Sequence, residues 1–70
     1  METFEIINHY GNSYGYVNAN NAREALCKYL MAHEELEDMM LYKDAFWGMW
    51  KLAEYDNEET YFVARKVRTI

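Results

Sequence analysis

The side chains that could act as an acid, a base, a nucleophile or a metal ligand are His9, His33, Cys27 and the carboxylates. Cys27 and His33 are six residues apart, which places them on opposite sides of a helix and disfavours a thiolate–imidazole pair. His33 and Glu37 are four residues apart, but two ligands do not complete a metal site, and a surface ion pair is the commoner outcome. The sequence therefore predicts a protein that is not an enzyme, without catalytic residues, metal or cofactor.

Charge is segregated along the chain. The sequence has 7 basic and 12 acidic residues, a net charge of −5. The stretch 60–70 contains Arg65, Lys66 and Arg68, whereas residues 1–59 contain the remaining 4 basic and all 12 acidic residues, a balance of −8. Binding to nucleic acid is driven by positive potential, so this balance disfavours it.

An acidic run follows the predicted helix. Its members, with a second acidic group nearer the C-terminus, are Glu34, Glu35, Glu37, Asp38, Asp56, Glu58 and Glu59. Such a run is most often a solvated helix face. The alternative is an acidic ridge that imitates the phosphates of DNA and makes the chain an anti-defence or DNA-mimic type inhibitor of a nucleic-acid-binding protein, provided that the two groups lie side by side.

Aromatic and methionine side chains are concentrated between residues 39 and 50. Trp, Tyr and Met are enriched in the buried centres of protein interfaces. Core packing explains the same residues equally well, because each large side chain buries much area in a small domain. We predict a protein-interaction domain, and specifically a homodimer, with these candidate partner-binding residues: Tyr42, Phe46, Trp47, Met49 and Trp50.

The length of 70 residues allows one small domain, 1–70, of marginal stability. A hydrophobic fraction of 51% excludes a disordered chain. Cys27 is the only cysteine, so an internal disulfide is impossible, and the longest apolar run is far shorter than a membrane span. We expect a cytoplasmic protein that does not bind membranes.

The N-terminal third has the pattern of a hairpin that leads into a helix. Residues 3–9 and 14–18 are rich in β-branched and aromatic residues, with turn-forming residues between them and Gly15 at the expected place of a bulge. Apolar residues at helical spacing then predict a helix from about 21 to 33, capped by Asn20 or Asn21. The stripe drifts after Glu34, which predicts a second, short helical segment.

The C-terminal half is harder to interpret. Residues 39–50 fit either a continuing helix or a strand, and Gly48 suits the middle of neither. Residues 50–55 and 60–67 predict a second hairpin. The expected fold class is α+β, with an antiparallel sheet from two hairpins in the order ββ-α(α)-ββ and the helix or helix pair packed on one face. An apolar ligand pocket between helix and sheet is a further hypothesis.

Residues 15–26 (GYVNANNAREAL), followed by 50–55 (WKLAEY) and 61–64 (YFVA), resemble small uncharacterised proteins of bacterial conjugative elements and phages. The likeness covers nearly the whole chain, but its motifs are structural: a strand that enters a capped helix, then a closing hairpin. It implies a small accessory or anti-defence role and supplies no site residues.

Overall fold

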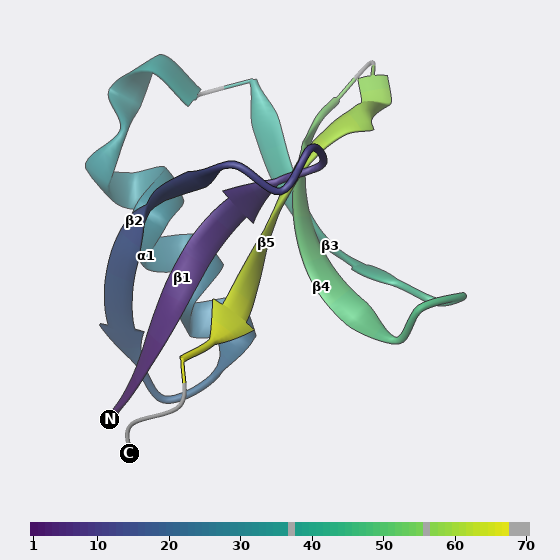
Figure 1. Cartoon of the computed structure of the whole chain (residues 1–70). Helices are drawn as coiled ribbons and strands as arrows, with labels where there is room; N and C mark the ends of the chain where they lie inside the picture. The colour runs from purple at the N-terminus through teal and green to yellow at the C-terminus, as the bar shows by residue number, and fades with distance from the viewer. Residues whose placement is uncertain (37, 56, 68–70) are drawn as a thin grey trace.

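The computed structural model describes residues 1–36, 38–55 and 57–67. These residues form an α+β fold in which five strands make one antiparallel sheet beside one α-helix (Figure 1). The elements, in chain order, are β1 (Glu2–Asn8), β2 (Ser13–Ala19), α1 (Ala22–Ala32), the 3₁₀ turn η1 (Glu34–Leu36), β3 (Met39–Asp44), β4 (Met49–Glu54) and β5 (Asn57–Lys66). The α+β class and the antiparallel sheet are as predicted, but the sheet has one strand more than two hairpins supply.

The N-terminal hairpin follows the sequence pattern closely. Asn8 organises its turn, because the side-chain oxygen accepts hydrogen bonds from the backbone N–H of Tyr10 and Asn12. The register of β1 and β2 then shifts by one residue on the β2 side, between the pairs Glu5–Tyr16 and Ile7–Ser13. Gly15 lies in this shift with a φ of 113°, a conformation that other residues rarely adopt, so the predicted bulge is confirmed.

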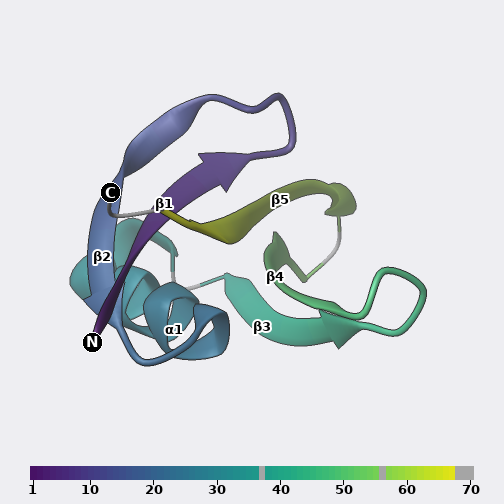
Figure 2. The ribbon, with the colours of Figure 1, turned by 60° about the horizontal axis from the view of Figure 1, so that its bottom comes forward.

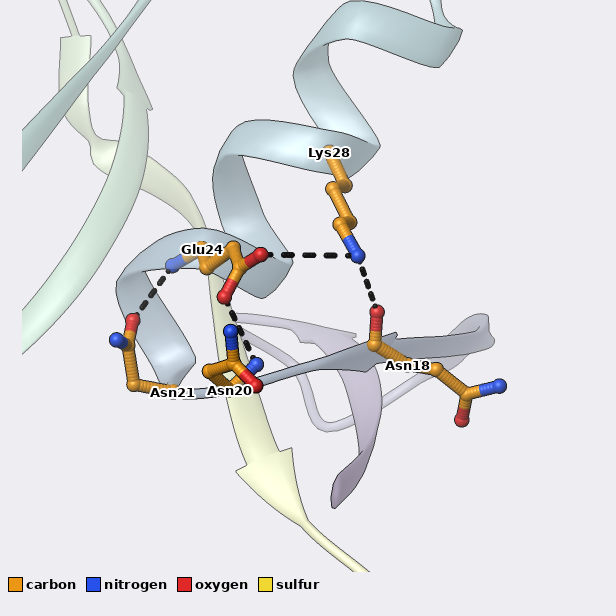
Figure 3. A network of polar contacts seen from close by, with 5 residues as sticks. All are labelled: Asn18, Asn20, Asn21, Glu24 and Lys28. Atoms are coloured by element: carbon orange, nitrogen blue, oxygen red, sulfur yellow. Dashed lines mark hydrogen bonds and ion pairs between the residues drawn. The ribbon is translucent and has the colours of Figure 1, made fainter. Parts of the chain in front are cut away.

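The helix begins where its cap predicts. The Asn21 side chain accepts a hydrogen bond from the Glu24 backbone N–H at 2.8 Å, and the Glu24 carboxylate accepts one from the Asn20 backbone N–H, also at 2.8 Å (Figure 3). Lys28 joins this network through the Asn18 carbonyl and the Glu24 carboxylate. The second helical segment is the single 3₁₀ turn η1, because Leu36 bonds back to the His33 carbonyl for one turn only.

Residues 39–50, which the sequence leaves open between helix and strand, form a strand, a turn and the start of a second strand. β3 pairs with β4 from Met39–Glu54 to Asp44–Met49, so Gly48 ends a turn and does not interrupt an element. Its φ is 68° and its N–H donates to the Asp44 carbonyl. The second hairpin is present as β4 and β5, and β3 is the additional strand at its outer side.

The sheet has the strand order β2-β1-β5-β4-β3, so the last strand in the sequence lies in the middle. β5 pairs with β1 on one side and with β4 on the other, which joins the two halves of the chain. Figure 2 shows the strands curving round α1, which contacts all five of them. In both views the β3–β4 turn projects away from the helix.

The core lies between α1 and the face of the sheet that curves round it. Ile6, Leu26 and Leu52 are fully buried there, with Phe4, Tyr29 and Phe62 packed around them. Within the described residues, no helix has the length and apolar character needed to cross a membrane.

Candidate protein-interaction surface

The sheet has a second face that α1 does not cover. Successive side chains along a strand point to opposite faces of a sheet. The residues that alternate with the core residues along each strand therefore point to this back face. Ile7 pairs with Val63, and Ala53 pairs with Tyr61 and Met40, which places apolar side chains across four neighbouring strands. Val63 and Ala53 are buried although they lie outside the core around α1.

A groove of about 350 Å³ runs across this back face. We call it the back-face groove. Its walls come from three parts of the chain: the end of β1 and its turn, the start of β4 with the preceding turn, and β5. The principal wall residues are Ile7, His9, Trp47, Met49, Tyr61 and Val63.

A buried cation lies in the groove. Lys51 is only 7% exposed, and its ammonium contacts the Asp44 carboxylate at 3.1 Å and lies 4.3 Å from the centre of the Tyr61 ring. A buried ammonium needs such compensation, because removal from water disfavours its charge. Next to it, the His9 ring lies 5.7 Å from the Tyr61 ring, and its buried Nδ1 has no hydrogen-bond partner in the part of the chain that the structure describes.

The turn between β3 and β4, residues 45–48, carries two exposed aromatic rings, and we call it the aromatic tip. Phe46 is 87% and Trp47 67% exposed, and their rings pack edge to face with centroids 5.2 Å apart. One oxygen of the Asp44 carboxylate accepts hydrogen bonds from the backbone N–H groups of both residues at 2.9 Å, while its other oxygen contacts Lys51. The tip is therefore ordered before any partner binds.

The pKa of Asp44 is held below its ordinary value of 3.8, first by the backbone N–H of Trp47 and then by the Lys51 ammonium. At neutral pH Asp44 is a carboxylate, the form that accepts all three contacts. A single charge thus orders the turn and neutralises the cation in the groove.

The structure separates the five candidate partner-binding residues into two groups. Phe46, Trp47 and Met49 are exposed at the tip and its base. Trp50 is half-buried, packs against the core, and lies under the Arg23 guanidinium at 5.3 Å. Tyr42 is half-buried and pairs with Lys51, on the back face.

The other end of the β3–β4 hairpin is acidic. A hollow of about 580 Å³, which we call the acidic hollow, is lined there by Glu35, Asp38, Met39, Met40, Glu54 and Tyr55, with Leu36. The Tyr55 backbone N–H donates to the Asp38 carbonyl at 3.1 Å, so the segment before β3 lies beside the end of β4.

Only some of the candidate acidic residues can be placed. Glu35 and Asp38 are exposed at the hollow, and Glu59 is exposed on β5. Glu37 and Asp56 lie outside the described residues, as do the side chains of Glu34 and Glu58. Glu54 was not among the predicted residues, because it ends an alternating strand pattern and looks like an ordinary solvent-facing position.

Ion pairs neutralise much of the remaining surface. Lys28 pairs with Glu24, Lys51 with Asp44, Arg65 with Glu5, and Lys66 with Glu2. The predicted basic cluster is thus partly neutralised, since Arg65 and Lys66 both contact acids of β1 and Arg68 lies outside the described residues. Asp38 and Glu54 form no ion pair within the described ranges, so negative charge remains at the acidic hollow.

The residues with catalytic potential have other contacts. His33 stacks on Tyr29 with centroids 4.3 Å apart and contacts Glu35 at 3.1 Å, while Cys27 is a partly buried free thiol. Glu37, the other half of the possible metal pair, lies outside the described residues. Among the residues that the structure describes, no three His, Cys, Asp or Glu side chains are close enough together to hold a metal ion.

Neither the back-face groove nor the acidic hollow is lined by α1, so neither of them is the ligand pocket expected between helix and sheet.

Sequence reasoning named Phe46 and Trp47 as candidate partner-binding residues, but it predicted neither the turn that carries them nor the groove beside it. Lys51, His9 and Tyr61 come from three different strands or turns, and no spacing in the sequence connects them. The one signal that could have indicated the turn is Asp44 followed by Gly48 four residues later. Hairpin turns often begin at an Asp that accepts backbone hydrogen bonds and end at a Gly with positive φ.

Comparison of the chain with protein-family models, with curated proteins and with solved structures finds no match.

Proposed function

We propose that this chain is a non-enzymatic, cytoplasmic protein-interaction domain that associates with a second copy of itself through the aromatic tip and the adjoining back face. The observation that carries the proposal is the exposure of Phe46 and Trp47 on a turn ordered by Asp44. Exposed aromatic side chains in a fixed geometry lose little conformational entropy on binding, which is what makes aromatic anchors effective.

Light scattering after size-exclusion chromatography tests this proposal. The chain should have twice its monomer mass at micromolar concentration, and Trp47→Ser should return it to the monomer. Tyr55→Ser is the matched control, because Tyr55 is 75% exposed but lies at the opposite end of β4. A wild-type chain that stays monomeric throughout, or a Tyr55→Ser variant that dissociates equally, would contradict the proposal.

A second candidate function is inhibition of a nucleic-acid-binding protein through the acidic hollow. The hydrogen bond between Tyr55 and Asp38 favours it, because it brings the segment before β3 beside the end of β4 and so extends the acidic surface. An anti-defence role, as the resemblance to proteins of mobile elements implies, fits this candidate.

Salt distinguishes the two candidates. Binding to an oligo-arginine peptide should weaken strongly between about 50 and 500 mM salt if the acidic hollow binds cations, whereas an apolar dimer should persist. The double variant Asp38→Asn, Glu54→Gln should lose most of the peptide binding and keep the dimer. Peptide binding that is unchanged in this variant would exclude the hollow as the binding site.

A further inference from the structure

The aromatic tip and the back-face groove are neighbours, but the two tip rings differ in their relation to the groove. Trp47 forms part of its wall, whereas Phe46 packs edge to face against Trp47 and is not among the residues that line the groove. Each molecule therefore presents an open, mostly apolar groove, which also contains Lys51 and His9, and directly beside it an exposed phenyl ring that does not line this groove.

We infer that two copies of the chain associate about a two-fold axis, with Phe46 of each protomer inserted into the back-face groove of the other. This inference rests on the proposed function, since it specifies how the self-association occurs. An isologous interface requires that one surface patch carries both complementary parts. The Phe46 ring and the back-face groove satisfy that requirement because Trp47 is next to the ring and is part of the groove. A single two-fold rotation therefore places each Phe46 in the groove of the other protomer.

The dimensions suit a weak dimer. The groove volume of about 350 Å³ is ample for one phenyl ring, since a cavity of about 150 Å³ already holds benzene. A covered aromatic side chain buries about 150 Å², so two Phe46 and two Trp47 rings, with the surface that they cover and Trp47 counted once, bury on the order of 900 Å². That area lies in the range of weak, transient interfaces.

The charges are compatible with this arrangement. Two chains of net charge −5 repel each other, so the contact has to form where charge is low. At the groove, Lys51 is neutralised by Asp44, while the acidic hollow is at the other end of strands six residues long, about 20 Å away. We therefore expect the dimer to tighten slightly as salt is added.

Photo-crosslinking tests the inference. Phe46→benzoylphenylalanine keeps an aromatic ring at the tip and makes it reactive, and a mixture of isotopically light and heavy chains identifies crosslinks between protomers. Mass spectrometry should find those crosslinks at residues 7–11 and 61–63 of the other protomer. Crosslinks between two tips, or to any other surface, would overturn the insertion but leave self-association standing. A monomer without crosslinks would overturn both.

Point variants give an independent measurement. Phe46→Ala should raise the dimer dissociation constant by about 30-fold, because the ring is the central anchor. Met49→Glu should do the same by placing a charge in the groove wall. Met40→Glu is its matched control, since Met40 is 43% and Met49 38% exposed on the same face of the sheet, and only Met49 lines the groove. Circular dichroism confirms that each variant is folded, and equal effects of the two Met variants would contradict the inference.

Discussion

The two ends of the β3–β4 hairpin are opposite in chemistry although the same two strands form them. At the aromatic tip, the charged groups Asp44 and Lys51 neutralise each other, and the exposed surface is aromatic. At the acidic hollow, Asp38 and Glu54 form no ion pair within the described residues, and the backbone bond from Tyr55 gathers the charge.

The difference shows how a domain of 70 residues can offer two separate surfaces with one small core. Both ends depend on the same central pairs, in which Leu52 faces Leu41 on one side and Phe62 on the other. What differs is whether a charge is neutralised locally or left to solvent. An apolar partner is expected at the first end and a cationic partner at the second, with opposite dependence on salt.

The largest effect on stability is expected in the middle of β4, because both ends of the hairpin depend on the packing there. Leu52 is fully buried in the middle of β4, so Leu52→Ala should lower the free energy of unfolding by about 2–5 kcal/mol, through lost burial and the cavity left behind. For a marginally stable domain this removes both surfaces together. Urea denaturation followed by circular dichroism measures the change. Met31→Ala, on the exposed face of α1, is the control, with a change of about 0.5 kcal/mol or less.

A smaller effect is expected at the start of the helix, away from both ends. Asn21→Ala removes the acceptor for the Glu24 N–H and should lower the free energy of unfolding by about 1 kcal/mol. Asn20→Ala is the matched control, since Asn20 contributes its backbone N–H, which the substitution keeps. Thermal unfolding measures both, and the affinity of the folded dimer should be unchanged in each. A Tm that falls equally in both variants would show that the cap is not the cause.

The local elements of the fold are those that the sequence predicts well. The Asn21 cap, the helical stripe and the turn at Asn8 depend on residues within four positions of one another. β3 was left open between helix and strand because its residues are apolar on both faces, Met39 and Leu41 toward the core and Met40 and Tyr42 toward the back face, so the strand shows no alternation. Its strand character depends on pairing with β4, which is a tertiary property.

The candidate site divides in the same way. Partner binding by Phe46 and Trp47 could be proposed from composition, because Trp and Met are enriched in interfaces, but the exposure of the two rings could not, since core packing explains them equally well. Burial of Lys51 could not, since a lysine between Trp50 and Leu52 has the pattern of an outward-facing strand residue. Its burial follows from the pairing of β5 with β4. This pairing brings the Tyr61 ring, ten residues later in the sequence, over the Lys51 ammonium.

The smallest expected effect is the response of the aromatic tip to acid. The pKa of Asp44 is lower in the folded protein than its ordinary value of 3.8, so the stabilisation that the carboxylate gives is fully present above that value and is lost as pH falls through the folded pKa. Following the Trp47 amide by NMR should give a titration midpoint below 3.8. The amides of the tip should then exchange faster, because the acceptor for two backbone N–H groups is weakened.

The control has to separate Asp44 from other carboxyl groups. The pKa of Glu5 is lowered by Arg65, and that of Glu35 by its own backbone N–H and by His33, so both lose stabilisation over the range below 4.5. Asp44→Asn retains an oxygen that can accept the backbone N–H groups and removes only the charge, so it should abolish the acid step at Trp47 and leave the other transitions in place. A midpoint at or above 3.8, or a step that persists in Asp44→Asn, would mean that the charge of Asp44 does not order the tip. The aromatic end would then differ from the acidic end only in its exposed rings.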